Sequence, residues 1–294
     1  MQKRVVFRSK SLPYLLLFPQ IAVTVVFFFW PSYQALESSL FIEDAFGFSR
    51  EFVGLRNFRE LFQDDVYRAS FSVTLVFGAA VTLMTMTIAL ALAAAADRVL
   101  HAATAYRTFL IWPYAVAPAI AGVTWFFLMN PTIGIVTYWL ENIFGMEWNH
   151  YVNGRRALIL VIVAASWQQI SYNFLFFLAG LQSIPKSMIE AAAIDRAGPL
   201  RRFWTITFPL LAPTSFFLLV VNLVYAFFGT FSLIDVTTNG GPANATSTLV
   251  VKVYQTGFVG QDYGSSAAQS VILMVIVMVV TVIQFRYIDR RVNY

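Results

Sequence analysis

Residues 69–96 read ASFSVTLVFGAAVTLMTMTIALALAAAA and contain no Asp, Glu, Lys or Arg. About 20 predominantly apolar residues in an α-helix span the hydrocarbon core of a bilayer, so this run is long enough to cross it. Its apolar residues follow one another continuously, whereas a membrane-spanning β-strand alternates apolar and polar residues. The run therefore predicts a transmembrane α-helix.

Five further runs are equally free of charged residues and longer than a bilayer requires. They are residues 11–36, 108–140, 157–185, 203–234 and 263–285. Hydrophobic residues make up 59% of the 294 residues and charged residues only 12%. About a quarter of the residues are charged in a typical soluble domain. We therefore expect an all-α integral membrane protein with one transmembrane domain over residues 1–294. Its six transmembrane helices are predicted near residues 12–33, 69–96, 108–129, 157–181, 210–232 and 263–285.

The basic residues divide unevenly between the two sides of the membrane that six spans define. One side comprises both chain ends and the segments 97–107 and 186–202. It holds 13 of the 20 Lys and Arg residues and a net charge of +9, while the other side has −4. Loops rich in Lys and Arg stay in the cytoplasm, so we expect both termini there. The overall charge of +5 is typical of a basic membrane protein, and no nucleic-acid partner is expected.

The sequence lacks the residues that metal binding, catalysis and nucleotide binding usually require. The sequence has no cysteine, and its two histidines, His101 and His150, are far apart, so no metal site is expected. No catalytic residue is expected either, because the charge-free runs hold no paired acids or histidine cluster. A Gly-x-x-x-x-Gly-Lys-Ser/Thr motif, which would hold nucleotide phosphates, is also missing from the sequence.

The longest predicted cytoplasmic segment, residues 182–208, has the pattern of two short helices joined by a turn. Pro185 suits the first turn of a helix because its φ is fixed and it has no N–H to leave unpaired. Gly198-Pro199 ends this helix, and a second one leads into the fifth span. Small and acidic residues lie on the first helix and its end: Glu190, Ala191, Ala192 and Asp195. Such a surface lets a partner's backbone approach closely and offers it negative charge, so we predict a docking element.

This segment resembles the coupling motif of ATP-binding-cassette importer permeases, in which Glu-Ala-Ala is followed by Gly and then by Ile-x-Leu-Pro. The matching residues are Glu190-Ala191-Ala192 and Ile206-Thr207-Phe208-Pro209, with Arg196 in the place of the Gly. Gly198, two positions on, is the candidate to supply the turn instead. Further stretches are similar to the carbohydrate-uptake class of these permeases: Gly54–Phe58, Pro113–Pro118, Trp167–Asn173 and Gly240–Pro242. Within the class, three stretches especially resemble the permeases of sn-glycerol-3-phosphate importers: Ser183–Pro185, Glu190–Asp195 and Ser215–Phe228.

The resemblance implies an assembly in the bacterial inner membrane. Two homologous but different permeases form the pore, an ATPase dimer docks beneath them, and a periplasmic binding protein delivers a small-molecule solute. ATP and Mg²⁺ would bind to the ATPase, and this chain is expected to bind no cofactor. Membrane lipid would contact the outside of the permease. The residues expected to couple it to the ATPase are Glu190, Ala191, Ala192, Asp195, Arg196 and Gly198.

Polar side chains in the middle of the fourth and fifth spans are candidates for the solute path, since such residues are costly in lipid unless they face a cavity or a partner. They recur at helical spacing and are Gln169, Tyr172, Asn173, Asn222 and Tyr225. Hydrogen bonds that only hold the helices together would account for the same residues equally well.

The solute itself is implied only by the resemblance. Glycerol-3-phosphate carries a phosphate, yet none of the charge-free runs supplies a cation for it. Either the second permease supplies one, or the pore holds the solute weakly and the binding protein selects it; we favour weak holding. Another sugar or polyol is the alternative within the class. An ion-coupled secondary transporter is the alternative from a different class, although such proteins usually place ionisable side chains inside the membrane.

Overall fold

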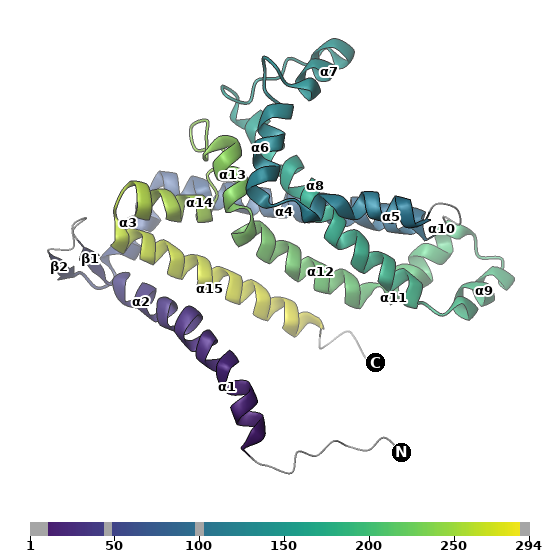
Figure 1. Ribbon diagram of the computed structural model, residues 1–294, viewed down its shortest axis with the longest axis horizontal. Coiled ribbons are helices and arrows are strands. Elements are labelled where there is room, and N and C mark those ends of the chain that lie inside the picture. The colour runs from purple at the N-terminus through teal and green to yellow at the C-terminus, as the bar shows by residue number, and fades with distance from the viewer. Residues whose placement is uncertain (1–10, 44–48, 98–102, 289–294) are drawn as a thin grey trace. The chain divides into compact units, whose positions relative to one another are not determined.

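The computed structural model describes residues 11–43, 49–97 and 103–288, and these are almost entirely helical (Figure 1). Five helices are long and apolar enough to cross a membrane, and one sharply bent pair would make a sixth crossing. The prediction of a helical membrane protein is thus confirmed. The predicted cytoplasmic position of the chain ends concerns residues 1–10 and 289–294, which lie outside the described ranges.

The described chain divides into two compact units. One unit contains residues up to 63 and residues 253–274, and the other contains residues 64–252 and those from 275 onwards. One boundary lies between Gln63 and Asp64, and the other two fall inside helices α14, Leu249–Tyr254, and α15, Tyr263–Ile288.

In the first unit, the N-terminal span is one continuous helix, Leu12–Ser38. It consists of α1, Leu12–Thr24, the π-helical turn η1, Val25–Phe29, and α2, Trp30–Ser38. The unit also contains α3, Arg56–Gln63, and the π-helical turn η5, Gln255–Val259.

The same unit corrects the all-α prediction, because it contains a small two-stranded sheet. Strand β1, Phe41–Glu43, pairs antiparallel with β2, Arg50–Phe52. Phe41 lies opposite Phe52, and their rings pack 5.3 Å apart. Arg50 forms ion pairs with Glu37 and Glu43, so ring packing and charge together stabilise a hairpin too short to give a sequence signal.

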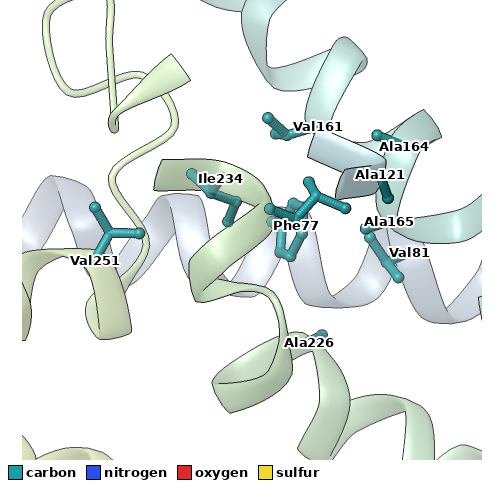
Figure 2. Packing of buried hydrophobic residues seen from close by; sticks show 10 residues of the cluster. Phe77, Val81, Ala121, Val161, Ala164, Ala165, Ala226, Ile234 and Val251 are labelled. Carbon is teal, nitrogen blue, oxygen red and sulfur yellow. The ribbon is translucent and has the colours of Figure 1, made fainter. Parts of the chain in front are cut away.

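The second unit is built on α4, Asp65–Ala96, and α8, Gly154–Ser183. The side chain of Asp64 accepts a hydrogen bond from the N–H of Val66 and so caps α4, while Asn153 caps α8 through the N–H of Arg156. Small residues line the interior of this unit and let the helices approach closely. Figure 2 shows the ring of Phe77 among smaller residues of the same buried cluster: Val81, Ala121, Ala164, Ala165 and Ala226.

The third predicted span, residues 108–129, is not a straight helix, and this prediction is corrected. The segment consists of α5, Ala103–Ile111, the 3₁₀ turn η2, Trp112–Ala115, and α6, Pro118–Leu128, and its two halves are bent by 99°. Val116 and Ala117 between them have extended backbone angles. Pro118 explains the break, because a proline disfavours the helical conformation of the residue before it and donates no hydrogen bond.

The fifth span, predicted near residues 210–232, corresponds to a crossing helix that covers Ala212–Gly229. It follows α11, Phe208–Leu210, and consists of α12, Ala212–Val224, and the π-helical turn η4, Tyr225–Gly229. After a break at Thr230, α13, Phe231–Thr238, packs against α6. A Cβ on Gly122 of α6 would lie 2.9 Å from the carbonyl oxygen of Leu233, so only glycine permits this approach.

The remaining helices are short connections. Helix α7, Ile135–Phe144, lies between α6 and α8. The predicted helix–turn–helix is present as α9, Lys186–Ile194, and α10, Pro199–Arg202, which continues as the π-helical turn η3, Phe203–Thr207. The other three predicted spans lie within helices that extend a few residues beyond them, namely α4, α8 and α15.

Candidate functional site

A cavity of about 660 Å³ lies in the second unit, where the broken third span, α8 and the end of α12 meet. Each of these three segments contributes part of its wall. The lining residues are Tyr114, Ala115, Val116, Ala117, Pro118, Gln168, Gln169, Tyr172, Val221, Val224, Tyr225 and Gly229. None of them is charged, so the cavity offers hydrogen bonds and aromatic surface but no formal charge.

Gln168 connects two walls of this cavity. Its Nε2 donates a hydrogen bond to the carbonyl oxygen of Val116 at 2.5 Å, at the point where the third span is broken. Its Oε1 accepts a hydrogen bond from the hydroxyl of Tyr225 at 3.3 Å. Gln168 was not among the predicted path residues, although its side-chain type and its position next to Gln169 gave the same signal.

Tyr225 is held in the π-helical turn η4, and its ring lies against Gly229, the last residue of that turn. A Cβ on Gly229 would come within 2.8 Å of Cδ2 of the ring. The hydroxyl of Tyr225 also lies 3.5 Å from the carbonyl oxygen of Ala165 in α8. Glycine at position 229 thus leaves room for the ring that reaches across to α8.

Two of the predicted path residues, Asn173 and Asn222, do not line the cavity. They are fully buried and donate hydrogen bonds to each other, at 2.9 Å from Asn173 to Asn222 and at 2.7 Å in return. Asn173 also donates to the carbonyl oxygen of Gln169. The pair therefore satisfies its own polar groups and links α8 to α12 directly.

The other three predicted path residues, Gln169, Tyr172 and Tyr225, are brought together around the cavity. The ring of Tyr172 lies 5.5 Å from that of Tyr114 and 4.7 Å from that of Phe176. Phe176 in turn lies 5.1 Å from Phe217 of α12. A row of four aromatic rings thus runs from the cavity along the contact between α8 and α12.

The predicted coupling residues lie on or just after α9. Glu190, Ala191 and Asp195 are exposed, whereas Ala192 is buried against the chain itself. Large apolar side chains beside them are also uncovered: Met188, Ile194, Leu200 and Trp204. Uncovered apolar side chains next to an exposed carboxylate are typical of an interaction surface.

The turn after α9 is made by Arg196, one of the predicted coupling residues, and not by the alternative candidate Gly198. Arg196 has φ +59°, in the left-handed region, whereas Gly198 has an extended backbone with φ −64°. The N–H of Ala197 donates to the carbonyl oxygen of Ala192, which closes the end of the helix. An αL residue at this point is usually glycine, so Arg196 takes the position of the motif's glycine in conformation as well as in order.

The sequence matches the family described as "Binding-protein-dependent transport system inner membrane component" over residues 4–294. The chain belongs to this family. It is therefore a multi-pass permease component of the inner membrane.

Curated relatives of this permease are similar over almost their whole length. It is 59% identical over 292 residues to the sn-glycerol-3-phosphate transport system permease protein UgpA of Rhizobium meliloti, covering 99% of each chain. It is 60% identical over 292 residues to the protein of the same name from Brucella abortus, again covering 99% of each chain.

Solved structures share the fold of the permease. It matches a bacterial transporter for the import of the acidic polysaccharide alginate with a TM-score of 0.79, at 21% identity and with 96% of each chain covered. The alginate transporter in complex with its alginate-bound periplasmic protein gives a TM-score of 0.78, at 20% identity, with 93% of this chain and 92% of that chain covered.

Proposed function

We propose that this permease is one of two homologous subunits that carry sn-glycerol-3-phosphate or related glycerophosphodiesters through an ATP-driven importer. The observation that supports this most is the near-60% identity, without large gaps in coverage, to permeases named for that solute. A periplasmic binding protein would deliver the solute and a separate ATPase dimer would hydrolyse ATP with Mg²⁺.

The solute path would pass the cavity lined by Gln169, Tyr172 and Tyr225. Because its lining carries no charge, the cavity would hold the glyceryl part of the solute by neutral hydrogen bonds and ring contacts, and the phosphate only weakly. Weak holding suits a pore, since a solute that binds too tightly leaves slowly. Selection for the phosphate would then rest with the binding protein.

The coupling element would be α9 and the turn at Arg196. In this proposal it faces the cytoplasm, in agreement with the excess of Lys and Arg on that side. Glu190 would pair with the ATPase, and the uncovered side chains of Ala191, Ile194 and Leu200 would pack against it. Asp195, Arg196 and Gly198 would set the angle between α9 and α10. Because the element joins α8 directly to α12, its movement would reach both walls of the cavity.

The test is uptake of radiolabelled sn-glycerol-3-phosphate by proteoliposomes that contain the complete importer, its binding protein and ATP. We expect Glu190→Lys to lower uptake about tenfold or more, because losing a charge pair at an interface costs about 2 kcal/mol or more. Glu147→Lys, which reverses an exposed carboxylate outside this element, is the matched control and should leave uptake unchanged.

Two results would contradict parts of this proposal separately. If the wild-type importer takes up another sugar or polyol but no sn-glycerol-3-phosphate, the solute assignment is wrong. If Glu190→Lys sustains wild-type uptake and ATP hydrolysis, the coupling role of Glu190 is wrong whatever the solute.

A further inference from the structure

Two irregular pieces of backbone border the cavity, and one side chain bonds to both of them. The third span is interrupted by the extended residues Val116 and Ala117, and the fifth span contains the π-helical turn η4. Gln168 projects from the regular helix α8 and is hydrogen-bonded to both irregular segments.

The bond to Val116 supplies a hydrogen-bond donor that the broken helix no longer provides. In an unbroken helix, the carbonyl of Val116 would accept a hydrogen bond from the N–H four residues later. The extended backbone at Val116 and Ala117 removes that partner, and an unsatisfied carbonyl costs several kcal/mol where there is no water. Gln168 replaces the missing donor with an amide from a neighbouring helix.

The bond to Tyr225 connects the same amide to the fifth span. Of the four π-helical turns in the described residues, η4 is the one that borders the cavity, and such turns occur frequently at functional sites. Here it places the ring of Tyr225 over Gly229 and its hydroxyl 3.3 Å from Oε1 of Gln168. Gln168 is only 5% exposed, so water competes little for either bond.

We propose that Gln168 is a positioning residue that holds the elbow of the third span against the fifth span and so keeps this wall of the cavity in place. The inference rests on the proposed function only in that the cavity is taken as the solute path. A shift of α8 relative to the fifth span would strain the bond of Gln168 to Tyr225, and a shift relative to the third span would strain its bond to Val116 at the elbow.

The absence of cysteine from the sequence makes this directly testable. Ala117→Cys places one thiol of this chain at the elbow, on an exposed residue that lines the cavity. Its rate of reaction with a small water-soluble maleimide is measured in the nucleotide-free complete importer, with partner subunits free of reactive thiols. Uptake and ATP hydrolysis are measured on the same preparations.

The key variant is Gln168→Leu, made in the Ala117→Cys chain, which keeps the side chain's approximate size but removes both bonds. We expect several-fold faster labelling of the introduced thiol, and ATP hydrolysis that depends less on loaded binding protein. Tyr225→Phe removes one bond and should give a smaller change in the same direction. In the Gln168→Leu background, Tyr225→Phe should add little, because only the long 3.5 Å bond of the hydroxyl to Ala165 is then left to remove. Gln34→Leu, at an exposed amide of α2, is the control and should not alter labelling.

Unchanged labelling in both Gln168→Leu and Tyr225→Phe would overturn the inference. So would a loss of uptake in Gln168→Leu without faster labelling, because Gln168 would then contact the solute rather than position the elbow. Additive effects of the two substitutions would also overturn it. If Gln168→Leu fails to assemble, the milder Tyr225→Phe still decides by its labelling rate. Since labelling requires no transport, a wrong solute assignment would leave these outcomes unaffected.

Discussion

Two polar links join α8 to the fifth span, and they differ in what surrounds them. The Asn173–Asn222 pair is fully buried, and each amide donates to the other. The Gln168–Tyr225 link lies at the cavity wall, and its amide also supports the broken third span. Polar residues at membrane depth thus serve two purposes within one pair of helices. The first link holds the helices together, and the second borders the space between them.

Breaking the buried link should have the largest effect on stability. Asn222→Leu leaves the amide of Asn173 without its main partner, and we expect a loss of about 1–2 kcal/mol in the free energy of unfolding. Denaturation of the purified permease in mixed detergent micelles measures this. Replacing both residues by leucine should recover part of the loss, because no buried amide then stays unpaired. A double variant that is as unstable as the two single losses combined would contradict this view of the pair.

Crowding the cavity-wall link should have the next largest effect. Gly229→Ala adds a Cβ within 2.8 Å of the ring of Tyr225, so the ring must leave the position from which its hydroxyl reaches Gln168. We expect a loss of about 1 kcal/mol. Combining it with Tyr225→Ala, which removes the ring, should abolish the effect of the added methyl group. The same unfolding assay applies, and an effect that persists without the ring would show that the clash is not the cause.

Removing only the hydroxyl of Tyr225 should cost less stability than either change. Its bonds to Gln168 and Ala165 are long, at 3.3 and 3.5 Å, and we expect Tyr225→Phe to lower the free energy of unfolding by about 0.5 kcal/mol. Uptake should fall more than this small loss implies, since the hydroxyl lies at the cavity. If stability fell as far as in Asn222→Leu, the distinction between the two links would fail.

The smallest expected effect is a dependence of stability on pH, and it arises in the segment between α7 and α8 rather than in either link. The amides of the links do not titrate, whereas His150, between α7 and α8, is buried with neither ring nitrogen in a well-formed hydrogen bond to a described residue. Burial lowers the pKa of His150 below its usual 6.5, and the nearby backbone of Met129 only partly opposes this. The unfolded state therefore binds the proton more readily, so stability should be constant above pH 6.5 and fall as the pH drops below it.

The control for this pH dependence is His150→Gln, which removes the titrating ring. Its melting temperature should vary less between pH 7.5 and pH 5.5 than that of the wild type. Asn222→Leu should retain the wild-type difference between the two pH values. A pH dependence that survives in His150→Gln would assign it to other groups.

Most of the fold could be predicted from the sequence because lipid imposes a simple rule on length and charge. The charge-free runs 69–96 and 157–185 correspond to α4 and α8, whose ends lie within a few residues of the ends of the runs. The same rule failed at residues 108–129, because hydropathy does not register a backbone break. The sequence contains Pro118 in this run. Because prolines are tolerated in transmembrane helices, Pro118 alone did not predict a bend of 99°.

The site was only partly predictable because it depends on which way each side chain faces. Gln168 and Gln169 are adjacent amides, and nothing in the order of residues indicates which one reaches Val116. Asn173 and Asn222 are 49 residues apart, so their pairing depends on how two spans pack. At the coupling turn, Gly198 was the natural choice by residue type, whereas the left-handed position is occupied by Arg196.

The broken third span bears on the order in which the protein is made. Its second half, α6, has 11 residues and is therefore about 16 Å long, roughly half the thickness of the hydrocarbon core. The carbonyl of Val116, between the two halves of the third span, accepts its hydrogen bond from the amide of Gln168. Gln168 leaves the ribosome some fifty residues after Val116. This span therefore cannot settle in lipid by itself, and until the fourth span arrives it depends on water or on the insertion machinery to solvate its exposed backbone.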